Sequence, residues 1–217
     1  MESRARDLTG VPLLGRELDL GLILEQVKRV EREGGAVVVV RGEAGIGKTR
    51  LMAEAVARAR LFGHIVLEGR ANVVEQSLPY STMLELLRSS PDRDSPGSAL
   101  GAASAVLEPG FVTDTRASTP GTHHVLAACF DLVASMASTS PTVLAIDDLH
   151  VADDATVALV TLLARRLADS RVLILATSRH VEPGRRPELD WLGPFRWRPS
   201  PAKAWTRRAA RRRPSPS

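Results

Sequence analysis

Gly42-Glu43-Ala44-Gly45-Ile46-Gly47-Lys48-Thr49 is the stretch of sequence that decides the fold of this chain. It follows the pattern G-x-x-x-x-G-K-[ST], in which glycines let the backbone curl until successive N–H groups point into one hollow. A run of valines, Ala36–Arg41, precedes it, and apolar residues recur on one face of a helical pattern from Lys48 to Leu61. This order of strand, glycine-rich loop and helix predicts a loop that binds phosphate at a helix N-terminus.

Two side chains of the loop suit nucleotide phosphates and their Mg²⁺ ion. We expect the ammonium of Lys48 to reach the β- and γ-phosphates, where it would also neutralise charge during hydrolysis, and the hydroxyl of Thr49 to ligate Mg²⁺. The predicted contact residues of this phosphate-binding loop are Gly42, Glu43, Ala44, Gly45, Ile46, Gly47, Lys48, Thr49 and Arg50.

A second motif is an apolar strand that ends in two carboxylates, Val143-Leu144-Ala145-Ile146-Asp147-Asp148. Downstream of a phosphate-binding loop, Asp147 is placed to hold the Mg²⁺ ion and its water shell. Asp148 stands where a general base for an attacking water would sit. The alternative is that both acids only solvate a strand end or cap the helix that follows.

The pattern along the chain alternates strands with helices, which favours a parallel sheet wrapped by crossover helices. Further strands are expected at His64–Gly69, Thr142–Asp147 and Arg171–Thr177. The predicted helices cover residues 13–33 with their lead-in, Lys48–Leu61, Ser81–Leu87, His123–Ala137 and Asp153–Asp169. The fold class is therefore α/β, a three-layer P-loop domain with its nucleotide site at the carboxyl ends of the strands. The strand at His64–Gly69 implies that an extra strand separates the loop strand from the acidic strand, as in the ASCE-type division of P-loop ATPases.

Composition divides the chain into three parts. Residues 1–12 form a polar lead, residues 13–190 the P-loop domain, and residues 191–217 a tail. Within the domain, residues 91–121 are rich in Ser, Gly, Pro and Ala, and we expect a loosely ordered insertion there. The single cysteine, Cys129, excludes an internal disulfide. No apolar run approaches the ~20 residues of a membrane span, and no signal-peptide core is present, so the expectation is a cytoplasmic protein.

The tail holds eight of the 29 basic residues and no acidic residue, so the rest of the chain has 21 basic against 25 acidic side chains. It also carries all three tryptophans, Trp191, Trp197 and Trp205. One interpretation is an arm that binds nucleic acid through phosphate contacts and base stacking. The other, which we favour, is a disordered segment without selected structure, as when a GC-rich gene is read out of frame and a longer protein ends early.

Four motifs in order resemble the ATPase domain of the large ATP-binding LuxR-type transcriptional regulators, an AAA-like domain of the STAND class. They are Leu14-Gly15-Arg16-Glu17, Val38 to Leu51, Asp147-Asp148-Leu149-His150-x-Ala152-Asp153, and Leu175-Ala176-Thr177-Ser178-Arg179. The resemblance covers residues 11–190. It implies ATP as the nucleotide and a switch function. It also places Arg16 near the adenine and ribose, and Arg179 where it senses the γ-phosphate.

The sequence departs from this family pattern in three places. Val151 stands where the family usually has Trp, residues 91–121 match nothing in the pattern, and the chain stops where a helical lid domain should begin. The leading expectation is therefore a truncated, ATP-binding module that hydrolyses slowly and is able to self-associate, with DNA contacted through absent domains or weakly through the tail. The alternatives are a nucleic-acid-binding protein acting through the tail and a non-functional remnant.

Overall fold

A computed structural model of the chain describes residues 15–90 and 120–179, with backbone alone for residues 120–124. Its centre is a four-stranded parallel sheet in the order β1-β4-β3-β2. The strands are β1 (Ala36–Arg41), β2 (Ile65–Arg70), β3 (Thr142–Asp147) and β4 (Val172–Ser178). The lead, most of the expected insertion and the tail lie outside the described residues.

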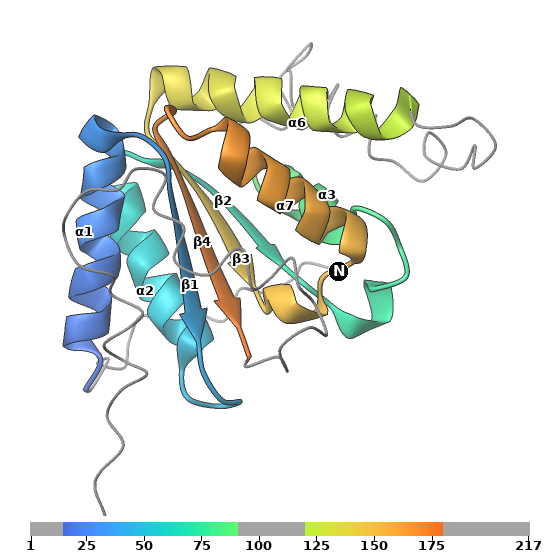
Figure 1. Cartoon of the computed structure of the whole chain (residues 1–217). Helices are drawn as coiled ribbons and strands as arrows, with labels where there is room; N and C mark the ends of the chain where they lie inside the picture. Colours follow the sequence, from blue (N-terminus) through green and yellow to red (C-terminus); the bar gives the residue numbers. More distant parts are fainter. Residues whose placement is uncertain (1–14, 91–119, 180–217) are drawn as a thin grey trace, which may run out of the picture.

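Helices cover both faces of the sheet, which gives the three predicted layers (Figure 1). One face carries α1 (Glu17–Glu33) and α2 (Lys48–Leu61). The other face carries α3 (Ser81–Arg88), α6 (Pro120–Thr139) and α7 (Asp154–Arg166). Two short 3₁₀ helices, η1 (Val73–Glu75) and η2 (Leu149–Val151), follow β2 and β3. No helix in the described ranges has the length and apolar character needed to cross a membrane.

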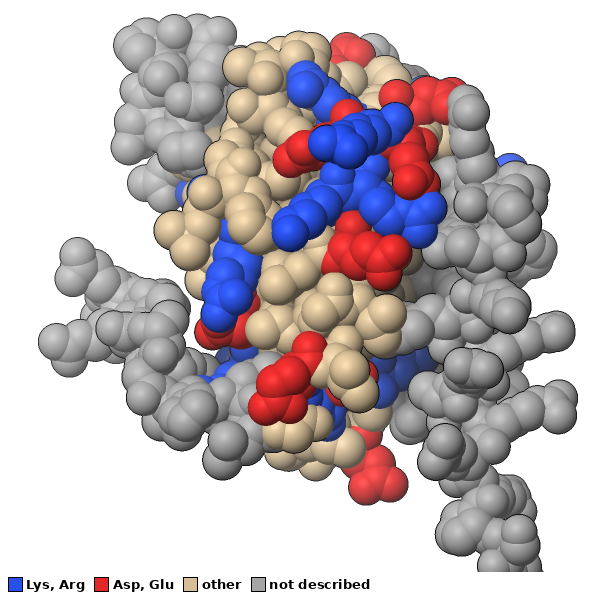
Figure 2. All heavy atoms as spheres, turned by 90° about the vertical axis from the view of Figure 1, so that its left-hand side faces the viewer, with Lys and Arg blue, Asp and Glu red and all other residues tan. Residues whose placement is uncertain are grey.

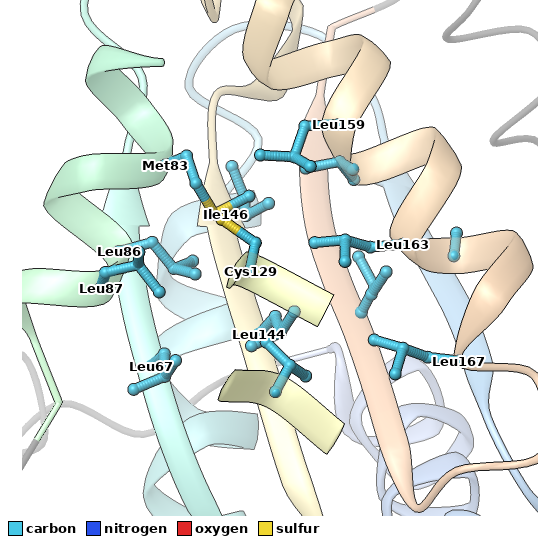
Figure 3. Packing of buried hydrophobic residues seen from close by; sticks show 14 of the residues in the cluster. Leu67, Met83, Leu86, Leu87, Cys129, Leu144, Ile146, Leu159, Leu163 and Leu167 are labelled. Carbon is cyan, nitrogen blue, oxygen red and sulfur yellow. The ribbon is translucent and has the colours of Figure 1, made fainter. Parts of the chain in front are cut away.

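Strand residues alternate between two apolar cores, as side chains on a pleated strand must. In β3, Val143 and Ala145 pack with α1 and α2, whereas Leu144 and Ile146 face α3, α6 and α7. Figure 3 shows the second core, where Leu144 and Ile146 lie among side chains of the covering helices, including Cys129 of α6. Because β1, β3 and β4 are covered on both faces, their sequences are apolar at consecutive positions rather than at alternate ones.

The strand that separates the loop strand β1 from the acidic strand β3 is β4. The predicted separation is confirmed, although β2, which suggested it, lies beyond β3 at the edge of the four strands. The outward N–H groups of β2 are met by α3: Ser89 Oγ accepts from Glu68 at 2.7 Å and Glu85 Oε2 accepts from Arg70 at 3.0 Å. Gly69 permits this approach, because a Cβ there would lie 3.0–3.1 Å from Leu86.

The outer face of α1 and α2 carries basic and acidic side chains in alternation rather than a field of one sign (Figure 2). Arg29 pairs with Glu33, and Arg58 with Glu54 at 2.8 Å. Surface pairs of this kind contribute at most ~1 kcal/mol each. On this face, therefore, the described basic side chains lie near acidic side chains that offset their charge.

Candidate functional site

The phosphate-binding loop lies between β1 and α2, at the carboxyl edge of the sheet (Figure 1). Its first N–H, of Gly42, donates to the carbonyl of Ser178 at the end of β4 (3.2 Å), which ties the loop to the neighbouring strand. Gly45 and Gly47 have φ of 76° and 89°, in the left-handed region that favours glycine. The two glycines thus supply the curled backbone predicted from the motif, and residues 43–47 are exposed to solvent.

Lys48 opens α2 with only 6% of its surface exposed. Its Nζ donates to two carbonyls of its own loop, those of Gly42 (3.0 Å) and Glu43 (2.8 Å). Within the described ranges, no carboxylate lies within ion-pair distance of this ammonium. A buried cation that is met only by neutral carbonyls is suited to an anionic ligand, because burying an unpaired charge costs free energy that an anion offsets.

Thr49 and Asp147 are 98 residues apart in sequence and in contact in the structure. The Thr49 hydroxyl lies 3.1 Å and 2.9 Å from the two carboxylate oxygens of Asp147, which is 97% buried. Adjacent oxygen ligands of an octahedral Mg²⁺ lie about 3 Å apart, because each bond is ~2.1 Å long. The hard oxygen donors and their spacing therefore fit the ion expected from the sequence.

Thr177, on β4, connects the Asp147 carboxylate to the backbone of Asp148. Its buried hydroxyl donates to Asp147 Oδ1 at 2.5 Å and accepts the backbone N–H of Asp148 at 2.9 Å. Asp148 has a φ of 55°, a left-handed conformation that Asp tolerates better than most residues. This hydroxyl thus fixes the turn in which the chain leaves β3.

Arg70, at the end of β2, reaches both carboxylates. Its Nε lies 3.6 Å from Asp147 Oδ2, and its Nη2 lies 3.4 Å from Asp148 Oδ2. His150 Nδ1 is 4.0 Å from Asp148 Oδ1. Sequence analysis assigned no role to Arg70 or Thr177. The available signal was that polar residues at the carboxyl ends of parallel strands meet at one edge.

The two arginines implied by the resemblance lie on either side of the loop. Arg16, immediately before α1, donates through Nη2 to the carbonyl of Ile46 at 2.7 Å. Arg179 follows β4, beside the residue that accepts from Gly42, and its backbone N–H donates to His150 Nδ1 at 3.4 Å. Arg50 is half-buried on the first turn of α2.

Asp153 is the centre of a buried polar cluster next to the site. Its carboxylate accepts hydrogen bonds from the backbone N–H groups of Tyr80 and Thr156, both at 2.7 Å, and from the Thr156 hydroxyl at 2.7 Å. The side chain therefore caps α7, so that the helix begins at Asp154, one residue later than predicted. The same bonds fix the start of α3, where Tyr80 has a φ of 63°.

The sequence of the chain is similar to those of known proteins. Residues 12–175 match the family model described as AAA ATPase domain. An uncharacterized protein of Rhizobium meliloti (strain 1021) is 27% identical over 197 residues; the alignment covers 78% of this chain and 19% of that protein, so the chain spans about a fifth of its relative.

Solved structures with similarity have low sequence identity. A chain from the structure of Drosophila ORC bound to DNA has a TM-score of 0.49 and 17% identity, covering 78% of this chain and 38% of that one. C. elegans PCH-2 has a TM-score of 0.45 and 14% identity, with coverage of 81% and 40%. The family match spans most of the chain and includes both the phosphate-binding loop and the acidic strand, and the chain therefore belongs to the AAA ATPase domain family.

Proposed function

We propose that this chain is a nucleotide switch module that binds ATP with Mg²⁺ and hydrolyses the ATP slowly. The proposal rests on one observation. The buried ammonium of Lys48 and the contacting pair Thr49 and Asp147 lie at the same edge of the sheet. A lysine without a carboxylate partner among the described residues supplies a cation for phosphate. The hydroxyl and carboxylate supply oxygen ligands for the accompanying metal ion.

Different groups at the site would bind the phosphates and the metal ion. Lys48 would exchange its two carbonyl acceptors for phosphate oxygens, which are stronger acceptors because they are charged. The left-handed glycines would direct backbone N–H groups at the same phosphates. Bound Mg²⁺, held by Thr49 and Asp147, would supply positive charge beside the transferred phosphoryl group.

We assign the general-base role to Asp148. Its carboxylate would accept a proton from water as the water oxygen attacks the γ-phosphorus and the bond to the β-phosphate oxygen breaks, releasing ADP and phosphate. Asp148 Oδ2 is ion-paired to Arg70 Nη2 at 3.4 Å. Breaking this pair would free Oδ2 to accept the proton of the water. Arg179, placed by β4 beside the start of the loop, is the proposed γ-phosphate sensor.

The resemblance to LuxR-type regulators suggests the larger setting. Since the alignment covers only 19% of the Rhizobium meliloti protein, we propose that domains of this type operate within longer chains. Self-association would then run through the ATPase domain, and DNA would be contacted through other domains. The preference for ATP over GTP rests on the same resemblance.

Calorimetric titration with Mg²⁺–ATP tests the proposal directly. Wild type should bind, and Lys48→Ala should lose binding by at least tenfold, because a charge-assisted contact contributes about 1.5–3 kcal/mol. Lys28→Ala is the matched control, since Lys28 lies over the Phe62 ring, outside the site. Equal affinities in wild type and Lys48→Ala, with both proteins folded, would refute the assignment. A competing GTP titration on wild type tests the base preference.

A second candidate function rests on the concentration of eight basic residues in the tail. An arm of this kind would give DNA affinity that falls steeply with salt. Deleting residues 194–217 and titrating DNA at several salt concentrations separates the two functions. A steep salt dependence that disappears with the tail would favour the nucleic-acid arm, whereas ATP binding that survives the deletion would favour the switch.

A further inference from the structure

Arg16 connects the start of α1 to the tip of the phosphate-binding loop across 30 residues of sequence. Its Nη2 donates to the Ile46 carbonyl at 2.7 Å, and its Nη1 is held by Asp19 Oδ2 at 3.3 Å. Only 25% of the arginine side chain is exposed, so the guanidinium is held between the helix and the loop. Both contacts are to protein groups.

The accepting carbonyl belongs to the peptide unit between Ile46 and Gly47. In a trans peptide the C=O and the N–H point in opposite directions. Holding the Ile46 carbonyl toward Arg16 therefore directs the Gly47 N–H away from Arg16. That N–H is one of the loop amides expected to face phosphate.

This peptide unit needs a restraint. Gly45 and Gly47 flank Ile46 with φ of 76° and 89°, and glycine adopts positive and negative φ with similar ease. A Cβ placed on either glycine would meet nothing within 4 Å, so the space beside the α-carbons of both glycines is open. Arg16 gives this peptide unit a hydrogen bond from a side chain, which can hold its orientation.

We propose that Arg16 is a positioning residue that clamps the phosphate-binding loop, with Asp19 orienting its guanidinium, and that it acts on the phosphates rather than on the base. The inference rests on the proposed function, in that the loop must be a polyphosphate site. It departs from the place beside adenine and ribose that the family resemblance gives to Arg16. The two assignments differ in what loss of the side chain does to ligands that lack a base.

The test is calorimetry with Mg²⁺–tripolyphosphate and with Mg²⁺–ATP on wild type, Arg16→Met and Arg32→Met. Arg32 lies in the last turn of α1, so its loss removes the same charge from the same helix at its far end. A clamp predicts that Arg16→Met weakens both ligands by the same factor, about tenfold. Arg32→Met should bind both as wild type does. If Arg16→Met binds ATP more weakly but binds tripolyphosphate as wild type does, the clamp is overturned in favour of a base contact. If Arg16→Met and Arg32→Met lose affinity equally, the clamp is overturned in favour of a long-range effect of charge.

Hydrogen exchange on the ligand-free protein gives a readout that does not need binding. Amides of residues 42–49 should exchange about tenfold faster in Arg16→Met than in wild type, because a charge-assisted bond restrains them. Amides of β3 serve as the internal reference for folding. Unchanged exchange in the loop overturns the clamp. If wild type binds neither ligand the proposed function fails, while the exchange comparison still decides the role of Arg16.

Discussion

Replacing Thr177 with Val should destabilise the protein more than the change in shape suggests. Valine matches threonine in volume and suits a buried strand, so packing of β4 should be retained. The hydroxyl, however, donates to Asp147 Oδ1 and accepts from the Asp148 N–H. Its loss leaves a buried carboxylate oxygen without one donor and a backbone N–H without an acceptor. Asp147 Oδ1 keeps its contact to Thr49 at 3.1 Å. A lost bond to a charged acceptor costs about 1.5–3 kcal/mol and an unsatisfied N–H about 1–3 kcal/mol, so the free energy of unfolding should fall by about 3 kcal/mol.

Urea denaturation followed by circular dichroism measures this change. With an m-value of ~2 kcal/mol/M, the midpoint for Thr177→Val should fall by about 1.5 M. Thr177→Ser is the matched control, because it keeps the hydroxyl and removes one buried methyl, which costs ~1 kcal/mol and about 0.5 M. A valine variant that is as stable as the serine variant would show that the hydroxyl does not stabilise the Asp147 carboxylate and the Asp148 N–H, and the reasoning would be refuted.

Three further predictions test other parts of the structure. Gly69→Ala should lower the free energy of unfolding by ~1–3 kcal/mol in urea melts, because its Cβ would lie 3.0–3.1 Å from Leu86. Gly21→Ala is the comparison, since a Cβ on Gly21 in α1 would meet nothing within 4 Å. This substitution should raise the free energy of unfolding by ~0.5–1 kcal/mol. Desolvation raises the pKa of Glu85 above its ordinary value of 4.5, so its contribution to stability is full below that pH and declines as pH rises. Glu85→Gln keeps an acceptor oxygen and should gain thermal stability relative to wild type between pH 4 and 7; parallel pH profiles would contradict this. Burial raises the pKa of the Cys129 thiol to about 12, so iodoacetamide at pH 8 should label it in urea but not in the native protein, and stability should fall as pH rises from 9 toward 12.

The elements that position the site could be predicted from the sequence. The strands Ala36–Arg41 and Thr142–Asp147 and the helix Lys48–Leu61 form with the predicted bounds. Each combines an uninterrupted apolar run or a helical period with a clear start or stop signal, so local pattern and tertiary burial agree.

The neighbour relations of the strands were harder to predict. Arg70 and Thr177 act on the acidic motif because β2 and β4 lie on either side of β3, and strand order is set by long-range packing rather than by any local period. Asp153 was predicted as a helical residue, and only the approach of α3 gives its carboxylate the N–H of Tyr80.

The strength of the ion pair between Arg70 and Asp148 limits how much this pair can slow hydrolysis in the proposed mechanism. Arg70 has 66% of its side chain exposed and lies 3.4 Å from the carboxylate. A solvent-exposed pair of this kind contributes at most ~1 kcal/mol, which is about a fivefold change in an equilibrium. If Asp148 is the base, at least about a sixth of the molecules would have it free. The slow turnover that we propose must therefore come mainly from incomplete positioning and charge stabilisation of the γ-phosphate, since these effects contribute several orders of magnitude in phosphoryl transfer. Arg70→Met should consequently raise the hydrolysis rate by no more than about sixfold, and a larger increase would identify Arg70 as the main restraint.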